Sequence, residues 1–164
     1  MAKNNKEEKT NVMRTLEQQG IPYTAHAYEH EEGVAVDGVT VAKSLGQDPE
    51  QVFKTLVARG ASKGIYVFVI PVADSLDLKK AARAVGEKSI EMVAVKEING
   101  LTGYVRGGCS PVGMKKQYPT VFHETAEIVD TIMVSAGKIG LQVELAPMAL
   151  VELVGGTLAD IVTG

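Results

Sequence analysis

Residues 52–71, VFKTLVARGASKGIYVFVIP, contain the two most strand-like runs of the chain. In the first run, alternate residues share one face: Val52, Lys54, Leu56 and Ala58. The second run, residues 64–71, is almost continuously apolar and stops at Pro71. A run of this kind is typical of a strand that is covered on both faces. We therefore expect these residues to form strands at the centre of the molecule.

The segments around this centre alternate between helix and strand patterns without a strict βαβ order. Helices are predicted in residues 1–20, 37–51, 77–86 and 147–156, with a helical turn at 95–100. The first has a buried stripe of Val12, Met13 and Leu16 and ends at Gly20. The second is capped by Thr40 and ends at Gly46, and the last runs from Pro147 to Gly155. Strands are predicted in residues 23–30, 89–94, 131–136, 141–146 and 157–162. Residues 103–119 form a long, glycine-rich, basic segment with little periodicity.

Strands therefore outnumber helices, and the fold class is mixed α/β: a mixed sheet or a barrel with helices outside. The length of 164 residues predicts one domain over residues 1–164, with a frayed terminus at 1–9. No apolar run approaches the roughly 20 residues that span a membrane, and the start lacks the apolar region of a signal peptide. With a single cysteine, the sequence predicts a cytoplasmic protein.

The net charge of −3 conceals an uneven distribution. Residues 1–53 carry a net charge of −4, residues 54–118 a net charge of +6, and residues 119–164 a net charge of −5. A basic middle can present a local positive surface to a nucleic acid. Solvated helix faces are the alternative explanation of the same pattern.

The segment HAYEH matches the H-x-x-E-H pattern of a zinc-peptidase helix through His26, Glu29 and His30. The surrounding residues alternate as in a strand, which would separate the two histidines by roughly 13 Å. One zinc ion cannot bridge that distance, so we expect no metal site. Instead, His26, Tyr28 and His30 would project from one strand face, to line a cleft or to lie exposed on an edge strand.

Two further features point to chemistry. Lys54 interrupts an apolar strand face, which marks either a functional site or an edge strand. Gly107 and Gly108 lie in a loop whose consecutive amides could donate to an oxyanion or a phosphate. The loop is not a Walker A motif, because Met114 stands where the lysine is required.

Cys109 suggests a thiol nucleophile with His123 as its base, but a small, inert loop cysteine is the favoured interpretation. Further along the chain, Ser135 precedes the tight turn Ala136–Gly137–Lys138. That turn alone indicates only a hairpin.

Four of these segments follow one another in the order HAYEH, VFKTLVA, GYVRGGCSPVGMKKQYP and SAGKIGLQVEL. This ordered set resembles the bacterial YbaK/EbsC family, which trans-edits Cys-tRNA(Pro). That family is related to the editing domain of bacterial prolyl-tRNA synthetases. The resemblance covers about residues 10–160. It implies a β-barrel-like mixed sheet of about six or seven strands surrounded by helices. The implied partner is the aminoacylated 3′ end of tRNA(Pro), with prolyl-tRNA synthetase as a further candidate, and no DNA, membrane or cofactor.

The resemblance also implies roles for single residues. Lys54, Gly107 and Gly108 would be catalytic: the lysine orients the terminal adenosine through its phosphate, and the glycine amides face the ester carbonyl. The substrate-binding residues would be Tyr28, His30, Ser135 and Gln142. Some family members carry a carboxylate at the position of Gln142, and a neutral amide cannot act as a general base.

The mechanism implied by the family needs no such base. The thiol of the substrate attacks its own ester, which gives a thiolactone and free tRNA, and intramolecular attack of this kind is efficient when geometry is held. Cys-tRNA(Pro), and also Cys-tRNA(Cys), are the expected substrates. Deacylation of another small amino acid (alanine or 2-aminobutyrate) on tRNA(Pro), or noncatalytic binding of tRNA or a synthetase, are the alternatives.

Overall fold

The computed structural model describes residues 9–163, so nearly all of the expected frayed terminus lies outside the described residues. Its helices are α2 (Asn11–Gln18), α3 (Gly38–Ser44), α4 (Leu78–Val85), α5 (Val95–Thr102), α6 (Pro147–Leu153) and the 3-10 helix η1 (Glu124–Glu127). Its strands are β1 (Tyr23–Ala27), β2 (Phe53–Gly60), β3 (Ile65–Pro71), β4 (Ile90–Met92), β5 (Thr120–His123), β6 (Ile132–Ser135), β7 (Leu141–Leu145) and β8 (Thr157–Ala159). The mixed α/β class is confirmed.

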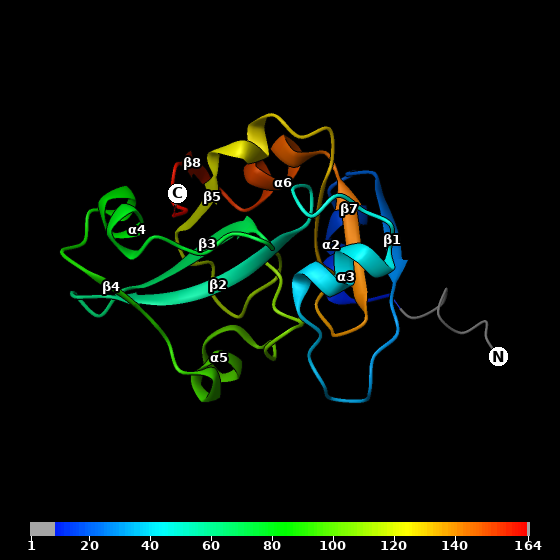
Figure 1. Cartoon of the computed structure of the whole chain (residues 1–164), viewed down its shortest axis with the longest axis horizontal. Helices are drawn as coiled ribbons and strands as arrows, with labels where there is room; N and C mark the ends of the chain where they lie inside the picture. The colour runs from blue at the N-terminus through cyan, green and yellow to red at the C-terminus, as the bar shows by residue number, and fades with distance from the viewer. Residues whose placement is uncertain (1–8, 164) are drawn as a thin grey trace.

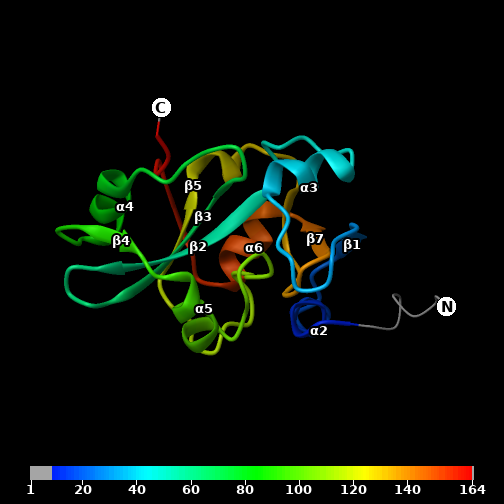
Figure 2. The same ribbon diagram turned by 60° about the horizontal axis from the view of Figure 1, so that its bottom comes forward.

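The strands form two open sheets rather than one barrel (Figures 1 and 2). One sheet has the order β1-β7-β6 and is antiparallel, and the other has the order β4-β2-β3-β5-β8 and is mixed. The expected barrel-like sheet of six or seven strands is therefore not confirmed, since the strands lie in one sheet of three and one sheet of five. Among the described residues, the two sheets meet at one parallel bridge between Val52 and Met133, and no continuous ladder closes them.

Strand β3 lies in the middle of the larger sheet and is covered on both faces, as its apolar sequence predicts. Val67 and Val69 pack into one core cluster, together with helix α2. Phe68 and Ile70 point the other way and pack with helix α4. The side chains of β3 point alternately to two buried faces, and both faces need apolar residues. The sequence of the strand therefore does not alternate between apolar and polar residues.

Helix α2 confirms its predicted pattern: Val12, Met13 and Leu16 are buried in the main core. The Thr10 side chain caps the helix by accepting a hydrogen bond from the Met13 amide at 3.2 Å. The segment 95–100, expected as a single helical turn, extends into the full helix α5.

The predicted cap of helix α3 is wrong, because the N-cap residue is Asp37 and not Thr40. The Asp37 carboxylate accepts hydrogen bonds from the amide of Val39 at 3.0 Å and from the hydroxyl of Thr40. Gly38 lets the helix start close to β3, because a Cβ atom there would lie 2.5 Å from a methyl group of Val72. The Asp37 cap therefore places the helix start three residues earlier than expected, and Gly38 allows the close approach to Val72.

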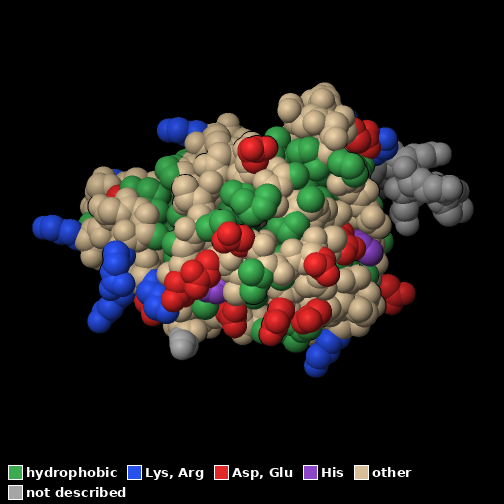
Figure 3. Space-filling model, turned by 90° about the horizontal axis from the view of Figure 1, so that it is seen from above, with side chains coloured by type: hydrophobic (Ala, Val, Ile, Leu, Met, Phe, Trp, Pro, Cys, Tyr) green, Lys and Arg blue, Asp and Glu red, His purple; other side chains and the backbone are tan. Residues whose placement is uncertain are grey.

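On the face shown in Figure 3, Lys and Arg side chains gather mainly at the end of the molecule that carries α4 and β4, while Asp and Glu side chains are spread over the rest. Helix α4 and strand β4 both belong to the basic middle of the sequence, and the choice between a nucleic-acid surface and a solvated helix face stays open. Within residues 9–163, no helix is long and apolar enough to cross a membrane.

Ile132 is fully buried and Ile128 is 78% exposed, which makes them a matched pair for testing the core. We expect Ile132→Ala to lower the free energy of unfolding by about 2–5 kcal/mol, since it removes buried methyl groups and leaves a cavity. Ile128→Ala should change it by less than about 0.5 kcal/mol. Urea unfolding measures both, and equal effects would contradict this description of the core.

Candidate functional site

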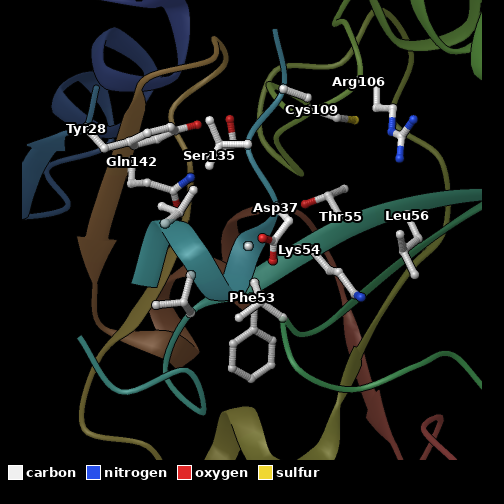
Figure 4. A pocket seen from close by; sticks show the side chains of 17 residues that line it. Tyr28, Asp37, Phe53, Lys54, Thr55, Leu56, Arg106, Cys109, Ser135 and Gln142 are labelled. Carbon is white, nitrogen blue, oxygen red and sulfur yellow. The ribbon is translucent and has the colours of Figure 1, made fainter. Parts of the chain in front are cut away.

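A cavity of about 650 Å³ lies where the two sheets meet. Four parts of the chain line it, and Figure 4 shows their side chains. They are the start of β2 with Val52–Leu56, the first half of α3 with its cap Asp37, the smaller sheet with Tyr28, Ser135 and Gln142, and the loop with Arg106, Gly107 and Cys109. The volume is in the usual range for a small-molecule site.

The smaller sheet presents its polar residues to the cavity because of its register. Ser135 of β6 is paired with Gln142 of β7, so both side chains leave the sheet on the same face. Their neighbours Val134 and Val143 point into the main core. A two-residue period in each strand therefore separates a core face from a cavity face.

Gln142 is only 7% exposed, and its Oε1 atom is buried without a hydrogen-bond partner in the described part of the chain. The Oγ1 atom of Thr55, which also lines the cavity, is in the same situation. A buried polar atom without a partner costs free energy, and such atoms at a cavity wall are suited to bind a ligand. By contrast, the hydroxyl of Ser135 accepts a hydrogen bond from the Gly137 amide at 3.1 Å.

Lys54 is half-buried and reaches the cavity from β2 (Figure 4). Burial lowers the pKa of its ammonium group, and the charges of Asp74 and Asp37 oppose that shift. Within residues 9–163, Lys54 forms no ion pair closer than 4 Å. The lysine that interrupts the apolar pattern thus brings a positive charge to the cavity.

The loop around Gly107 is pressed tightly against two other segments. Gly107 has a φ of +88°, and a Cβ atom there would lie 2.6 Å from the Cβ of Ala35. A Cβ atom on Gly108 would lie 3.0 Å from the backbone of Lys138 and Ile139. The glycines are therefore required for close packing as well as for any contact with a ligand.

Gly107 and Gly108 differ in their contact with the cavity. Gly107 lines it with its backbone, whereas Gly108 does not line it. The Gly108 amide donates a hydrogen bond to the carbonyl of Val105 at 2.9 Å. A turn therefore uses one of the two consecutive amides that could donate to a ligand, and the donor role of the glycine amides stays a prediction.

The expectation that His26, Tyr28 and His30 share one strand face is also only partly met, because β1 ends at Ala27. Tyr28 lines the cavity. His26 pairs with Glu144, with Nε2 and Oε1 2.8 Å apart. His30 is exposed outside the cavity, with its ring against Gly140.

Because β1 is a strand, the HAYEH segment lacks the helix that the zinc-peptidase pattern requires. No group of three or more His, Cys, Asp or Glu side chains is arranged to hold a metal ion in residues 9–163.

Cys109 lines the cavity, but its surroundings do not activate it. Burial raises the pKa of its thiol to about 11, which disfavours the nucleophilic thiolate. His123, its proposed base, does not line the cavity and accepts a hydrogen bond from the Ile161 amide at Nδ1, 3.3 Å away. The dyad interpretation is wrong, and the inert interpretation fits the structure.

Sequence reasoning missed three polar residues of the cavity: Asp37, Thr55 and Arg106. Thr55 and Arg106 directly adjoin Lys54 and Gly107, so adjacency to predicted residues was the available signal. Asp37 carried only a helix-capping signal.

A sequence model of the aminoacyl-tRNA editing domain matches residues 32–153. The chain belongs to this family. The resemblance inferred from the ordered motifs is therefore confirmed. EbsC of Enterococcus faecalis, a candidate Cys-tRNA(Pro)/Cys-tRNA(Cys) deacylase by its name, is 47% identical over 163 residues, which cover 99% of each chain.

Solved structures agree with this assignment to the editing-domain family. A candidate trans-editing enzyme for prolyl-tRNA synthetase has a TM-score of 0.79 and 25% identity, covering 96% of this chain and 100% of that one. A protein described only as hypothetical has a TM-score of 0.83 and 22% identity, covering 94% of this chain and 100% of the other. The second likeness supports the fold alone.

Gly107 and Gly100 test the packing of the loop as a matched pair. Gly107→Ala should distort the loop, because the added methyl group meets Ala35 and the positive φ is unfavourable for alanine. Gly100 lies in α5 with nothing within 4 Å of its Cβ position, so Gly100→Ala should leave stability unchanged or raise it by up to about 1 kcal/mol. Thermal unfolding of both variants measures the contrast, and an undisturbed Gly107→Ala protein would contradict the close packing.

Proposed function

We propose that this editing-domain protein is a cytoplasmic, single-domain, trans-acting deacylase that releases cysteine from Cys-tRNA(Pro). Family membership and the name of the 47% identical EbsC support this proposal. The observation that carries it is the composition of the cavity: a cation, a glycine backbone and buried polar groups, with no activated nucleophile among the residues that line it. That set can position an ester without attacking it.

Lys54 would hold the RNA end of the substrate. Its ammonium group carries a positive charge in a partly buried position, where attraction to a phosphate is less screened than at the surface. Because its two nearby carboxylates influence it without direct contact, the ammonium group keeps its hydrogen-bond donors for a ligand.

The smaller sheet would hold the aminoacyl end. The orphan Oε1 atom of Gln142 can accept a hydrogen bond from the α-ammonium group, and Tyr28 and Ser135 lie on the same side of the cavity in Figure 4. Gln142 is neutral, so it would orient the substrate and not take up a proton. Gly107 would face the ester with its backbone.

The substrate would supply the nucleophile. The cysteinyl sulfur, once its proton has passed to water, attacks the ester carbonyl carbon and forms the C–S bond of a thiolactone. The bond between that carbon and the ribose oxygen breaks, and the ribose oxygen takes up a proton, which frees the tRNA. Well-oriented intramolecular reactions can reach effective molarities of about 10⁵ M or more, so a site that holds the sulfur close to the carbonyl carbon accelerates this step.

The central test is Lys54→Ala in deacylation of Cys-tRNA(Pro). We expect the release of cysteine to fall by at least about a hundredfold, because the variant loses the charge that holds the RNA end. Lys43→Ala removes an exposed lysine from the last turn of α3 and should keep wild-type activity. Full activity of Lys54→Ala would contradict the site, and inactivity of the wild-type protein would contradict the function.

Cys109→Ala separates the two possible sources of the thiol. If the substrate supplies it, this variant retains most of the activity, since the Cys109 thiol is buried and protonated. Loss of activity in a folded Cys109→Ala protein would instead place the nucleophile on the enzyme.

A further inference from the structure

Arg106 lines the cavity from the loop opposite β2, and neither the sequence patterns nor the family resemblance assigned it a role. Figure 4 shows its guanidinium group and the Lys54 ammonium group on the same side of the cavity, away from Tyr28 and Gln142. The cavity therefore has a cationic end and a neutral polar end.

The backbone that carries Arg106 is held in place. The hydrogen bond from the Gly108 amide to the Val105 carbonyl closes a turn, with Arg106 and Gly107 at its centre. Gly107 packs on Ala35, and Gly108 packs on the backbone at Ile139, so the turn is fixed on both sides. Upstream, the hydroxyl of Tyr104 donates to the Val112 carbonyl and ties the ends of the loop together.

The charges around Arg106 are not balanced within the cavity. Asp37 is the one acidic residue among those that line it, and its carboxylate already accepts hydrogen bonds from the Thr40 hydroxyl and the Val39 amide. In the described range 9–163, Arg106 forms no ion pair. Asp74 does not line the cavity, but its charge also reaches Lys54. Neither carboxylate forms an ion pair with Lys54 or Arg106 in residues 9–163, so both cations keep their donors for an anionic ligand.

We propose that Arg106 and Lys54 together clamp the phosphate backbone at the 3′ end of the RNA substrate, with Arg106 as the second cation. This inference rests on the proposed function for the identity of the ligand. The guanidinium group suits the role because its planar donors can bind two phosphate oxygens at once, whereas a lysine offers a point charge. The fixed turn reduces the backbone entropy lost when that contact forms, although the exposed Arg106 side chain still has to become ordered.

The first experiment measures kcat/KM for Cys-tRNA(Pro) across a salt series. Arg106→Ala should lower kcat/KM at low salt by about tenfold or more, chiefly through KM, because it loses a charge-assisted contact. The slope of log(kcat/KM) against log[salt] should become shallower by about 0.7, the value expected for one phosphate contact on single-stranded RNA. Arg106→Lys should keep the wild-type slope and recover part of the activity.

Arg14→Ala is the matched control, because Arg14 is exposed on α2 and does not line the cavity. It should keep both the rate and the slope of the wild type. Unchanged kinetics of Arg106→Ala, or a loss that does not depend on salt, would overturn the clamp. Equal melting temperatures of the two alanine variants would show that the comparison concerns folded proteins.

A second experiment does not depend on catalysis. Fluorescence anisotropy measures binding of an uncharged RNA oligonucleotide that ends in CCA, and Arg106→Ala should weaken it and flatten its salt dependence. Equal binding by wild type and Arg106→Ala would overturn the inference. A wild-type protein that binds this RNA through Arg106 but releases no cysteine would refute the proposed function and leave the clamp standing.

Discussion

The junction between the two sheets is the contact on which the site depends. The Met133 amide donates to the carbonyl of Gln51 at 2.9 Å, and the Val72 amide donates to the carbonyl of Val52 at 2.8 Å, so three strands meet at one point. The side chains of Val52, Val72 and Met133 pack together there with α3. Lys54 lies two residues beyond Val52, and Ser135 two residues beyond Met133, so the same junction sets the distance between the cationic and the neutral sides of the cavity.

This arrangement suits a reaction in which the protein positions a substrate rather than attacking it. The cavity combines a buried amide oxygen without a partner, a glycine backbone and two cations, whereas its single thiol is kept protonated by burial. A site of this kind gains rate by fixing the conformation of a bound ester and by stabilising the charge that develops on its carbonyl oxygen. Such a site also explains the absence of a recognisable triad motif from the sequence.

The sequence predicted the helices and strands whose patterns are local. It did not predict the features that depend on packing between segments far apart in the chain. The continuous apolar run of β3, the buried stripe of α2 and the charge of Lys54 on a strand were all readable, because one strand or helix determines each. The start of α3 is a different case, because its cap is local: the Asp37 carboxylate accepts hydrogen bonds from the Val39 amide and the Thr40 hydroxyl, and the prediction chose Thr40 as the cap instead. By contrast, the position of Arg106 across from Lys54 depends on distant segments, because the loop that carries Arg106 packs on Ala35 and Ile139.

The most direct test of the account is a comparison of two amino acids on the same tRNA. Wild-type protein would be mixed with Cys-tRNA(Pro) and with Ala-tRNA(Pro), and the rate of release would be measured for each. We predict that cysteine is released at least about a hundredfold faster, because only cysteine carries the thiol that attacks the ester. Comparable rates for cysteine and alanine would require an activated water and would contradict the proposal that the substrate supplies its own nucleophile.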